Sequence, residues 1–305
     1  MSKKTIAIIA GAAVAVIAVA VTLVAVLSKG NSYRLLKLFD FEGTGTVTRE
    51  NKGDITPYPN MVLESGDQIS LVTGRMTIQA DDDKFLTLDE HTTIKLIATG
   101  SSAHSKTTIE LIEGGITSDI RNKLSADSTY EVNTPNSAMS VRGTVFYTSV
   151  YKDEKTGITY TRVCCFEGSV ATRLVYKDGK TSVENVIVPM GKEVIIYEDG
   201  TTTDYLVTEP KDIDYSTIPD EELLNLKDKI ENENLELSIT SPEIVRLLEG
   251  PYEVKFTYNG QVFGTQTVEK GGFAQIPALS PAPTGSWQFD FSTAIEHDTT
   301  IEWQE

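Results

Sequence analysis

The sequence QISLVTGRMTIQADDDKFLTLDEHTTIKLI, residues 68–97, contains four short runs in which apolar and polar residues alternate. The runs begin at Gln68, Arg75, Lys84 and Thr93, and Gly or Asp residues lie between them. Alternation with a period of two places the apolar side chains on one face of a strand. Four such runs in succession, without a helical pattern between them, predict an all-β fold built from short strands.

Runs of the same kind extend the pattern in both directions. They cover residues 43–48, 108–112, 130–132, 145–151, 158–163, 169–176, 183–188 and 194–197. Asp178-Gly179 and Asp199-Gly200 are tight-turn signals between neighbouring runs. We therefore expect a β-domain over residues 63–200.

A helical pattern follows this domain. It begins at Asp220, where Pro219 and three acidic residues suit a first helical turn, and it continues to Ile230. Residues 201–250 are therefore predicted to form an acidic helical connector. Residues 251–305, which are rich in Gly, Thr and aromatic residues, are predicted to form a second, small β-module.

The N-terminal segment 5–27, TIAIIAGAAVAVIAVAVTLVAVL, contains no charged residue. As a helix it would be roughly 35 Å long, which is enough to cross a bilayer. Lys3 and Lys4 favour a cytoplasmic N-terminus. We expect residues 1–30 to be a single-pass anchor in the cell membrane, residues 31–62 to be a juxtamembrane segment with a first strand, and the C-terminus to be extracellular.

A cleaved signal peptide is the alternative to this anchor. Its cleavage site would follow Ala18-Val19-Ala20, but the sequence remains apolar through Leu27, and signal peptides have shorter apolar cores. Both interpretations place the remaining chain beyond the membrane.

The chain is acidic, with a formal net charge of −17. An acidic surface repels the phosphate backbone of nucleic acids, so a nucleic-acid partner is not expected. It also repels anionic lipid headgroups, so membrane contact is expected through the helix alone.

The two cysteines, Cys164 and Cys165, are adjacent. Neighbouring side chains of a strand point to opposite faces, and a disulfide between neighbours is strained. We expect one cysteine in the core and the other on the opposite face. If the thiol on the opposite face is exposed, it could form an intermolecular disulfide.

No motif points to catalysis or to a bound cofactor or metal. His91, His104 and His297 lack the spacing of a metal site or a catalytic triad. The acidic run 81–83 lacks the Gly and distal Glu of a calcium loop, so a solvated turn is favoured. The sequence predicts a non-enzymatic protein without cofactors. It leaves open whether folding brings two carboxylates together as a catalytic pair.

Six short pieces follow one another between residues 63 and 197. They are LESGDQI (63–69), LTLDEHTTI (86–94), LIEGGI (111–116), VNTPNSAMSVRGTVF (132–146), FEGSV (166–170) and VPMGKEV (188–194). In this order they resemble the FecR domain family. The motif residues, which we assign structural roles, are Gly66, Asp67, Thr134, Pro135, Arg142, Gly143, Thr144 and Gly168.

These motif residues have physical interpretations of their own. Gly66-Asp67 and Gly168 are typical of turns, and Thr134-Pro135 requires an extended backbone. Arg142, between Val141 and Gly143, suggests a guanidinium held by backbone carbonyls. An anion or partner contact by Arg142 is the alternative.

The resemblance implies a β-solenoid or sandwich-like domain that senses signals outside the cytoplasm. The namesake members relay an iron–siderophore signal to a cytoplasmic sigma factor through a cytoplasmic region ahead of their membrane helix. Here four residues precede the predicted span, so we do not expect direct control of a sigma factor.

The tail, from Glu253 to Trp303, contains the pieces VKFTYNG (254–260) and QTVEKGG (266–272). With these pieces it resembles the Listeria–Bacteroides repeats of bacterial surface proteins, as in internalin B. The resemblance implies a β-grasp-like module of a Gram-positive surface protein.

The sequence as a whole predicts a membrane-anchored binding or sensing protein outside the cytoplasm. Its expected partner is a protein or a cell-wall glycan. The alternative is a component of a transmembrane signalling pathway that acts through a separate membrane partner.

Overall fold

The computed structural model describes residues 34–101, 104–198 and 205–305. The predicted membrane helix, residues 5–27, lies outside these ranges. Among the helices in the described ranges, none combines the length and the apolar character that a bilayer span requires.

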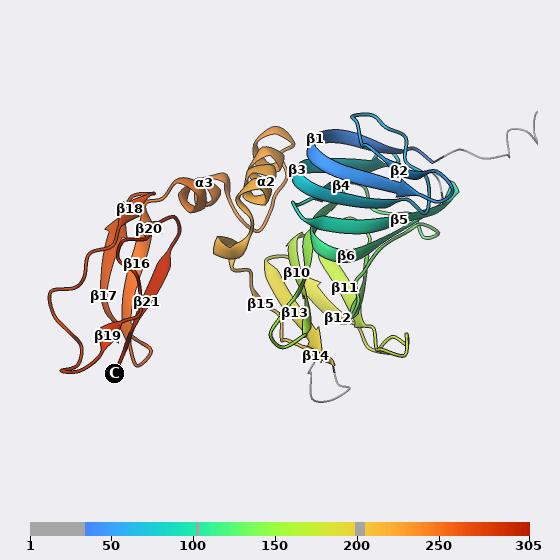
Figure 1. Cartoon of the computed structure of the whole chain (residues 1–305). Coiled ribbons are helices and arrows are strands. Elements are labelled where there is room, and N and C mark those ends of the chain that lie inside the picture. Colours follow the sequence, from blue (N-terminus) through green and yellow to red (C-terminus); the bar gives the residue numbers. More distant parts are fainter. Residues whose placement is uncertain (1–33, 102–103, 199–204) are drawn as a thin grey trace, which may run out of the picture.

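Most of the described chain is β-structure, as predicted, and fifteen of its strands form one hydrogen-bonded network (Figure 1). These strands are β1 (Leu36–Arg49), β2 (Gly53–Ile55), β3 (Gln68–Ala80), β4 (Lys84–Leu88), β5 (Thr92–Ser101), β6 (His104–Ile120), β7 (Thr129–Asn133), β8 (Ser137–Val141), β9 (Val145–Lys152), β10 (Thr159–Glu167), β11 (Ser169–Leu174), β12 (Val186–Pro189), β13 (Lys192–Glu198), β14 (Tyr205–Val207) and β15 (Lys211–Asp212). We call this network, residues 36–212, the β body.

The long strands of the β body take part in two sheets. The first half of β6 pairs with β5 and with the parallel strand β7, whereas its second half pairs with β4 and β9. In the same way, β3 pairs with β5 through its first residues and with β4 through its last. One sheet continues from β7 to β8, β11 and β12, and the other continues from β9 to β10, β13 and β14. The result is sandwich-like, with strands that cross from one sheet to the other.

Glycines permit this crossing. Gly43 of β1 lies opposite Gly74 of β3, and both have positive φ angles. A Cβ atom at Gly74 would lie 2.1 Å from the carbonyl oxygen of Glu42, so only glycine allows the two strands to approach there. The sequence predicted separate strands starting at Gln68 and Arg75. The structure corrects this prediction, because the chain bends at Gly74 without leaving the ladder.

The core of the β body lies between the two sheets. It contains alternate residues of strands from both, so Ile69 and Ile94 of one sheet belong to the same cluster as Ile78 and Ile116 of the other. The alternation that predicted the strands is therefore the alternation of core and surface positions.

Two helices cover the outer face of β9 and β10. They are α2 (Asp220–Asn232) and α3 (Ser241–Glu249), preceded by the 3₁₀ turn η1 (Tyr215–Thr217). Leu223, Leu226 and Ile244 of the helices pack in one cluster with Val145 and Phe166 of the sheet. The helix predicted from Asp220 is confirmed, and α3, with its capping box of Thr240 and Glu243, is an addition to the prediction.

The helical cover also explains the cysteines. Cys165 belongs to the core of the β body, and Cys164 belongs to the cluster under the helices. The prediction that they face opposite sides is confirmed, but neither thiol is exposed, because α2 and α3 cover the outer face. Burial raises the pKa of Cys164 strongly and that of Cys165 to about 12. An intermolecular disulfide through Cys164 or Cys165 is therefore excluded in the folded protein.

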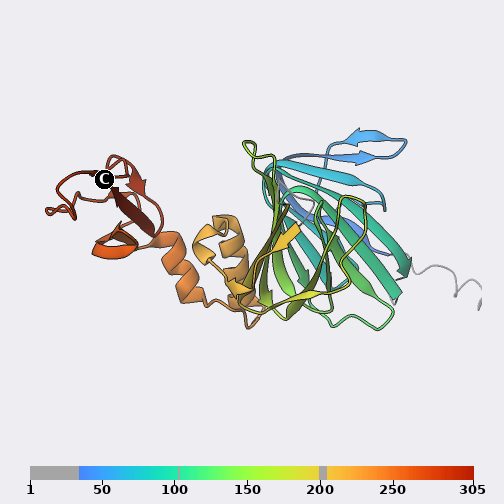
Figure 2. The same cartoon turned by 90° about the horizontal axis from the view of Figure 1, so that it is seen from below.

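The C-terminal part forms its own β unit, which Figures 1 and 2 show beyond α3, on the side away from the β body. Its strands are β16 (Tyr252–Tyr258), β17 (Gln261–Val268), β18 (Gly272–Phe273), β19 (Ser286–Trp287), β20 (Ala294–Ile295) and β21 (Thr299–Gln304). β16 pairs with β17 and, in parallel, with β21. Trp287, Trp303 and Phe256 fill a core that is separate from the other two clusters. We call residues 251–305 the C-terminal unit.

Candidate functional site

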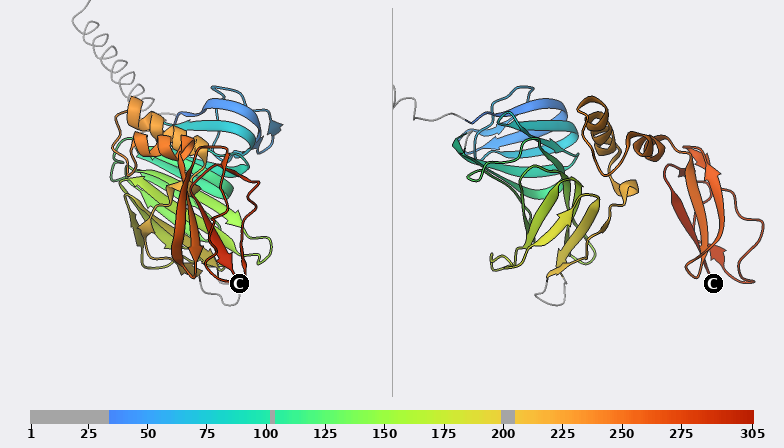
Figure 3. Two further views of the ribbon diagram at one scale, coloured as in Figure 1. Left: turned by 90° about the vertical axis from the view of Figure 1, so that its left-hand side faces the viewer. Right: turned by 180° about the vertical axis from the view of Figure 1, so that it is seen from behind.

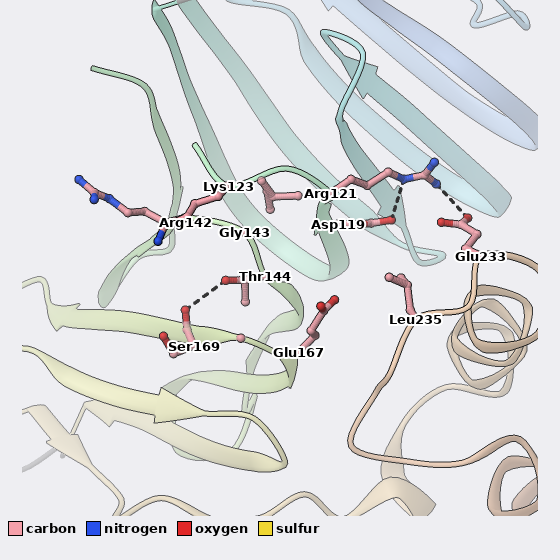
Figure 4. A pocket seen from close by; sticks show the side chains of 12 residues that line it. Asp119, Arg121, Lys123, Arg142, Gly143, Thr144, Glu167, Ser169, Glu233 and Leu235 are labelled. Carbon is pink, nitrogen blue, oxygen red and sulfur yellow. Dashed lines mark hydrogen bonds and ion pairs between the residues drawn. The ribbon is translucent and has the colours of Figure 1, made fainter. Parts of the chain in front are cut away.

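Four of the eight motif residues meet at one polar cleft of about 630 Å³, which Figure 4 shows from close by. The cleft lies where β6 ends, where β8 turns into β9, where β10 turns into β11, and where α2 ends. Its lining residues are Asp119, Ile120, Arg121, Lys123, Arg142, Gly143, Thr144, Glu167, Gly168, Ser169, Glu233 and Leu235. We call this site the polar cleft.

Two glycines bring the loops of the polar cleft together. Gly143 has a φ of 132° and Gly168 a φ of 77°, values that side chains disfavour. A Cβ atom at Gly168 would lie 2.7 Å from the carbonyl oxygen of Gly143. Thr144 is buried beside them, and its hydroxyl donates to the carbonyl of Ser169 at 3.2 Å. The motif therefore fixes the floor of the cleft by close backbone contact.

One side of the polar cleft is an ion-pair network. The carboxylate of Asp119 is buried and pairs with Lys229 and with Arg121. Arg121 in turn binds Glu233 at 2.9 Å. Burial, assisted by the charge of Asp119, raises the pKa of Glu167 above its usual range. These pairs tie the end of β6 to α2 through one oxygen of Asp119, Oδ2, whereas Oδ1 of the same carboxylate is buried without a hydrogen-bond partner in the described ranges.

The other side carries two exposed cations. Figure 4 shows Lys123 and Arg142 on the side of the cleft opposite to Asp119, Arg121 and Glu233. Within the described ranges, no hydrogen bond or ion pair involves the side-chain nitrogens of Arg142 or Lys123. The expectation that carbonyls hold the Arg142 guanidinium is therefore wrong. The backbone carbonyl of Arg142 accepts from the N–H of Leu124, and the side chain of Arg142 is exposed.

Gly66 and Asp67 lie away from the polar cleft, in the turn before β3. The buried Asp67 carboxylate accepts from the backbone N–H of Glu64 at 2.8 Å, which is the turn chemistry that the sequence predicted. It also accepts two hydrogen bonds from Arg49, at 2.8 and 2.7 Å. This pair joins β1 to the turn that precedes β3.

Thr134 and Pro135 lie in the turn between β7 and β8. The hydroxyl of Thr134 accepts from Thr161 at 2.9 Å, and the Asn136 amide donates to the carbonyl of Thr159 at 3.1 Å. The turn is thereby attached to β10 of the opposite sheet. Thr134 and Pro135 have a structural environment and do not line the polar cleft.

Several cleft residues were not singled out from the sequence. Asp119, Lys123, Glu167 and Glu233 stand in different segments, and only folding brings them together. Glu167 was part of the Glu-Gly piece of the family resemblance, which could have drawn attention to it. Nothing in the local sequence distinguishes Glu233, which directly follows α2, from the acids of that helix.

The polar cleft presents cations and carboxylates that can contact a charged partner. Within the described ranges, no group of three His, Cys, Asp or Glu side chains has metal-binding geometry.

The acidic run 81–83 forms the turn between β3 and β4. Asp81 is buried there against Arg34 and Lys84, so the prediction of a solvated turn is wrong at this residue.

Comparisons with known proteins give one family match and two similar solved structures. Residues 68–171 match the model of the family described as FecR protein. Two crystal structures of a "putative anti-sigma factor" from Parabacteroides distasonis are similar at 11% and 12% sequence identity. In both cases the TM-score is 0.37, and the match covers 78% of this chain and 98% of the other. No curated protein matches the chain significantly.

The family match and the resemblance of the motifs concern the same part of the chain. The matched range contains six of the eight motif residues, namely Thr134, Pro135, Arg142, Gly143, Thr144 and Gly168, and it begins one residue after Asp67. It begins with β3 and ends within β11. Residues 68–171 of this chain are a FecR domain.

Proposed function

We propose that this chain is a membrane-anchored, extracytoplasmic binding or sensing protein whose FecR domain receives a protein partner in the polar cleft. The FecR domain supports a sensing or signalling role. The single observation that carries the choice of site is the convergence of Arg142, Gly143, Thr144 and Gly168 on one cleft beside unpaired cations. The glycines fix the shape of the floor, and the cations supply charge for recognition.

The partner is expected to present acidic groups. Lys123 and Arg142 are exposed and unpaired within the described ranges, whereas Asp119 and Glu233 on the other side of the cleft are paired with Lys229 and Arg121. An acidic loop of a protein would pair with the two cations at little desolvation cost, because both are already in contact with solvent.

Site-directed photocrosslinking of the full chain in cells tests this proposal. A photoreactive amino acid replaces Ser169 at the cleft or, as the control, Lys180, whose side chain is exposed in the hairpin between β11 and β12. We expect a discrete adduct from position 169 that Arg142→Glu removes. Equal adducts from both positions, or an adduct unaffected by Arg142→Glu, would contradict the proposal.

The membrane topology is part of the same proposal. It is supported by the uncharged segment 5–27 and by Lys3 and Lys4 ahead of it. A membrane-impermeant maleimide applied to intact cells should label a Val183→Cys variant, because Val183 is exposed. Labelling only after the cells are lysed would contradict an extracellular C-terminal part.

A signalling pathway with a separate membrane partner remains the second candidate. The FecR domain favours it, and the Ala and Gly residues of segment 5–27 would permit close helix packing in the membrane. A photoreactive group at Ala15 distinguishes the two candidates. An adduct with another membrane protein favours signalling, and its absence favours a simple surface receptor.

A further inference from the structure

The start of β1 presents an apolar surface to solvent. Residues 35, 37 and 39 point outward, while Leu36 and Leu38 between them are buried. Leu35 is 42% exposed and Phe39 is 48% exposed. Large apolar side chains that gather on a surface usually mark a contact site.

A neighbouring segment enlarges this surface. Leu38 donates its N–H to Met61, and Leu63 donates to Leu36, both at 2.9 Å, so residues 61–63 run beside the start of β1. Val62 thereby lies opposite Lys37 and is 65% exposed. We call Leu35, Lys37, Phe39 and Val62 the β1 patch.

A β-bulge directs Phe39 outward. The pairing with β3 passes from Leu38 directly to Asp40, so Phe39 has no partner opposite it. Its ring packs edge-on against Phe85 at 5.7 Å, and the Lys37 ammonium lies 5.1 Å from its centre. Bulges of this kind re-aim side chains at functional places.

The composition of the β1 patch suits the interface of a bilayer. Aromatic rings and long basic side chains are enriched at the level of the lipid headgroups, and aliphatic side chains enter the acyl region. Asp40 and Glu64 border the patch, and Glu64 is already paired with Arg49 and Lys52. Apolar contact is therefore expected to dominate over attraction to anionic lipids.

The position of the β1 patch in the chain indicates that its contact is the bilayer. The proposed membrane segment ends at Leu27, and only residues 28–33 separate it from the first described residue. Six residues, fully extended, reach roughly 20 Å. Figures 1 and 3 show that the described chain begins on the side of the β body opposite to the C-terminal unit. A surface attached by so short a tether stays within reach of the bilayer.

We propose that the β1 patch lies in the headgroup region of the membrane and fixes the orientation of the FecR domain on it. The inference rests on the proposed membrane anchoring. It revises the expectation that only the helix touches lipid, because the β1 patch is locally apolar although the whole chain is acidic. The C-terminal unit would then project away from the membrane.

Spin-label accessibility in lipid nanodiscs tests the proposal on the full-length chain. The bilayer consists of phosphatidylcholine with phosphatidylglycerol, and one cysteine is introduced per variant. Cys164 and Cys165 are buried, so labelling is confined to the new site. Val62→Cys reports the patch, and Val183→Cys, which replaces a valine that is 95% exposed, is the matched control. Ala15→Cys reports the anchor.

We expect the label at residue 62 to be more accessible to oxygen than to a water-soluble nickel chelate, and the label at residue 183 to show the reverse. Adding Leu35→Ser and Phe39→Ser should shift residue 62 toward the values of residue 183. A water-like label at residue 62 with a deeply placed label at residue 15 would overturn the patch and leave the anchoring intact. A water-like label at residue 15 would overturn the anchoring itself and the patch with it.

Discussion

Asp67 shows how one buried carboxylate holds two parts of the chain together. It binds the Arg49 guanidinium through both oxygens and also accepts from the backbone of Glu64. The hydrogen bonds that the Arg49 guanidinium donates to Asp67 hold the pKa of Arg49 above its usual value. Such a pair is costly to break on one side only, because the remaining charge is left buried without a partner.

Asp67→Ala is expected to lower the free energy of unfolding by roughly 3–5 kcal/mol, since Arg49 would lose its principal partner. Urea denaturation followed by circular dichroism measures this loss. Glu64→Ala is the matched control, because Glu64 also pairs with Arg49 but is half exposed. A solvent-exposed pair contributes about 1 kcal/mol or less. Equal losses in the two variants would contradict the role assigned to Asp67.

Glu222 of α2 is a buried acid with an unusual environment. Burial first, and then the charge of Asp89, raises its pKa to about 8. Asn225 donates to its carboxyl oxygens at 3.2 and 3.3 Å. The charged or titratable groups of the surrounding elements are Arg75 of β3, Asp89 after β4, Asp119 of β6, Tyr147 of β9 and Lys229 of α2.

The raised pKa predicts how stability depends on pH. The folded chain retains the Glu222 proton between about pH 4.5 and 8, whereas the unfolded chain has lost it, so stability falls as the pH rises through this range. Glu222→Gln should match the wild type near pH 5 and exceed it by roughly 2 kcal/mol at pH 9. Thermal unfolding at several pH values measures the difference. Glu221→Gln, an exposed neighbour, should show no such trend, and parallel curves for Glu222→Gln and the wild type would refute the assignment.

The residue scale also shows what the sequence could and could not predict. Asp67 follows a glycine in a turn signal, and its backbone bond follows from that local chemistry. Glu222 resembles the other acids at the start of α2, and only the docking of the helix on the sheet buries it. Arg142 was assigned to carbonyls because its neighbours are apolar, yet the turn directs it to solvent.

At the scale of elements, the crossing of long strands depends on glycine. Gly74→Ala would place a Cβ atom 2.1 Å from a carbonyl oxygen of β1 at a positive φ angle. We expect a loss of roughly 2–4 kcal/mol, since backbone must move on both strands. Gly53→Ala has a similar φ angle but nothing within 4 Å, and it should cost about 1 kcal/mol. Chemical denaturation compares the two, and similar losses would refute the steric explanation.

The cover formed by α2 protects Cys164. Leu226 is buried in the cluster under the helices, so Leu226→Ala should loosen the cover and cost about 2–4 kcal/mol. We expect maleimide to modify Cys164 faster by roughly an order of magnitude, while Cys165 in the main core changes less. Tandem mass spectrometry distinguishes the two thiols. Leu224→Ala, at an exposed position of α2, should leave the rate unchanged, and faster modification of Cys165 than of Cys164 would contradict the model of a removable cover.

The elements were predictable to different degrees for a physical reason. A period of two identifies a strand wherever one face is buried, and the acidic first turn identifies α2. The alternation continues across Gly74, so the sequence does not show whether the chain turns back there or bends. The burial of Cys164 depends on a helix about sixty residues further along the chain, which no local pattern reveals.

At the scale of the whole molecule, three clusters of buried side chains divide the described chain. The third belongs to the C-terminal unit, whose links to α3 include the Arg246–Asp298 ion pair and a hydrogen bond from Lys270 to Leu248. Both tryptophans of the chain, Trp287 and Trp303, lie in this cluster. Tryptophan fluorescence therefore reports the C-terminal unit selectively.

The Phe256→Ala variant tests whether the C-terminal unit unfolds separately from the β body. Phe256 packs edge-on against Trp287 at 5.1 Å, and its removal should destabilise the C-terminal unit by roughly 3–5 kcal/mol. We expect the fluorescence transition to move to lower temperature while the far-ultraviolet circular dichroism transition of the β body stays in place. Val262→Ala, at an exposed position of β17, serves as the control. A joint shift of both transitions would mean that the two parts unfold as one.

The crossing strands have a consequence for how the FecR domain could respond to a partner. The end of β6 carries Asp119 into the polar cleft, and the beginning of the same strand is paired with β5 and β7 in the other sheet. A displacement at the cleft is therefore expected to reach the far sheet along the backbone of one strand, β6, since both halves belong to it. Both sheets of such a domain would respond when a partner binds in the cleft. Hydrogen exchange should therefore slow in β5 and β7 whenever a partner slows it at Asp119.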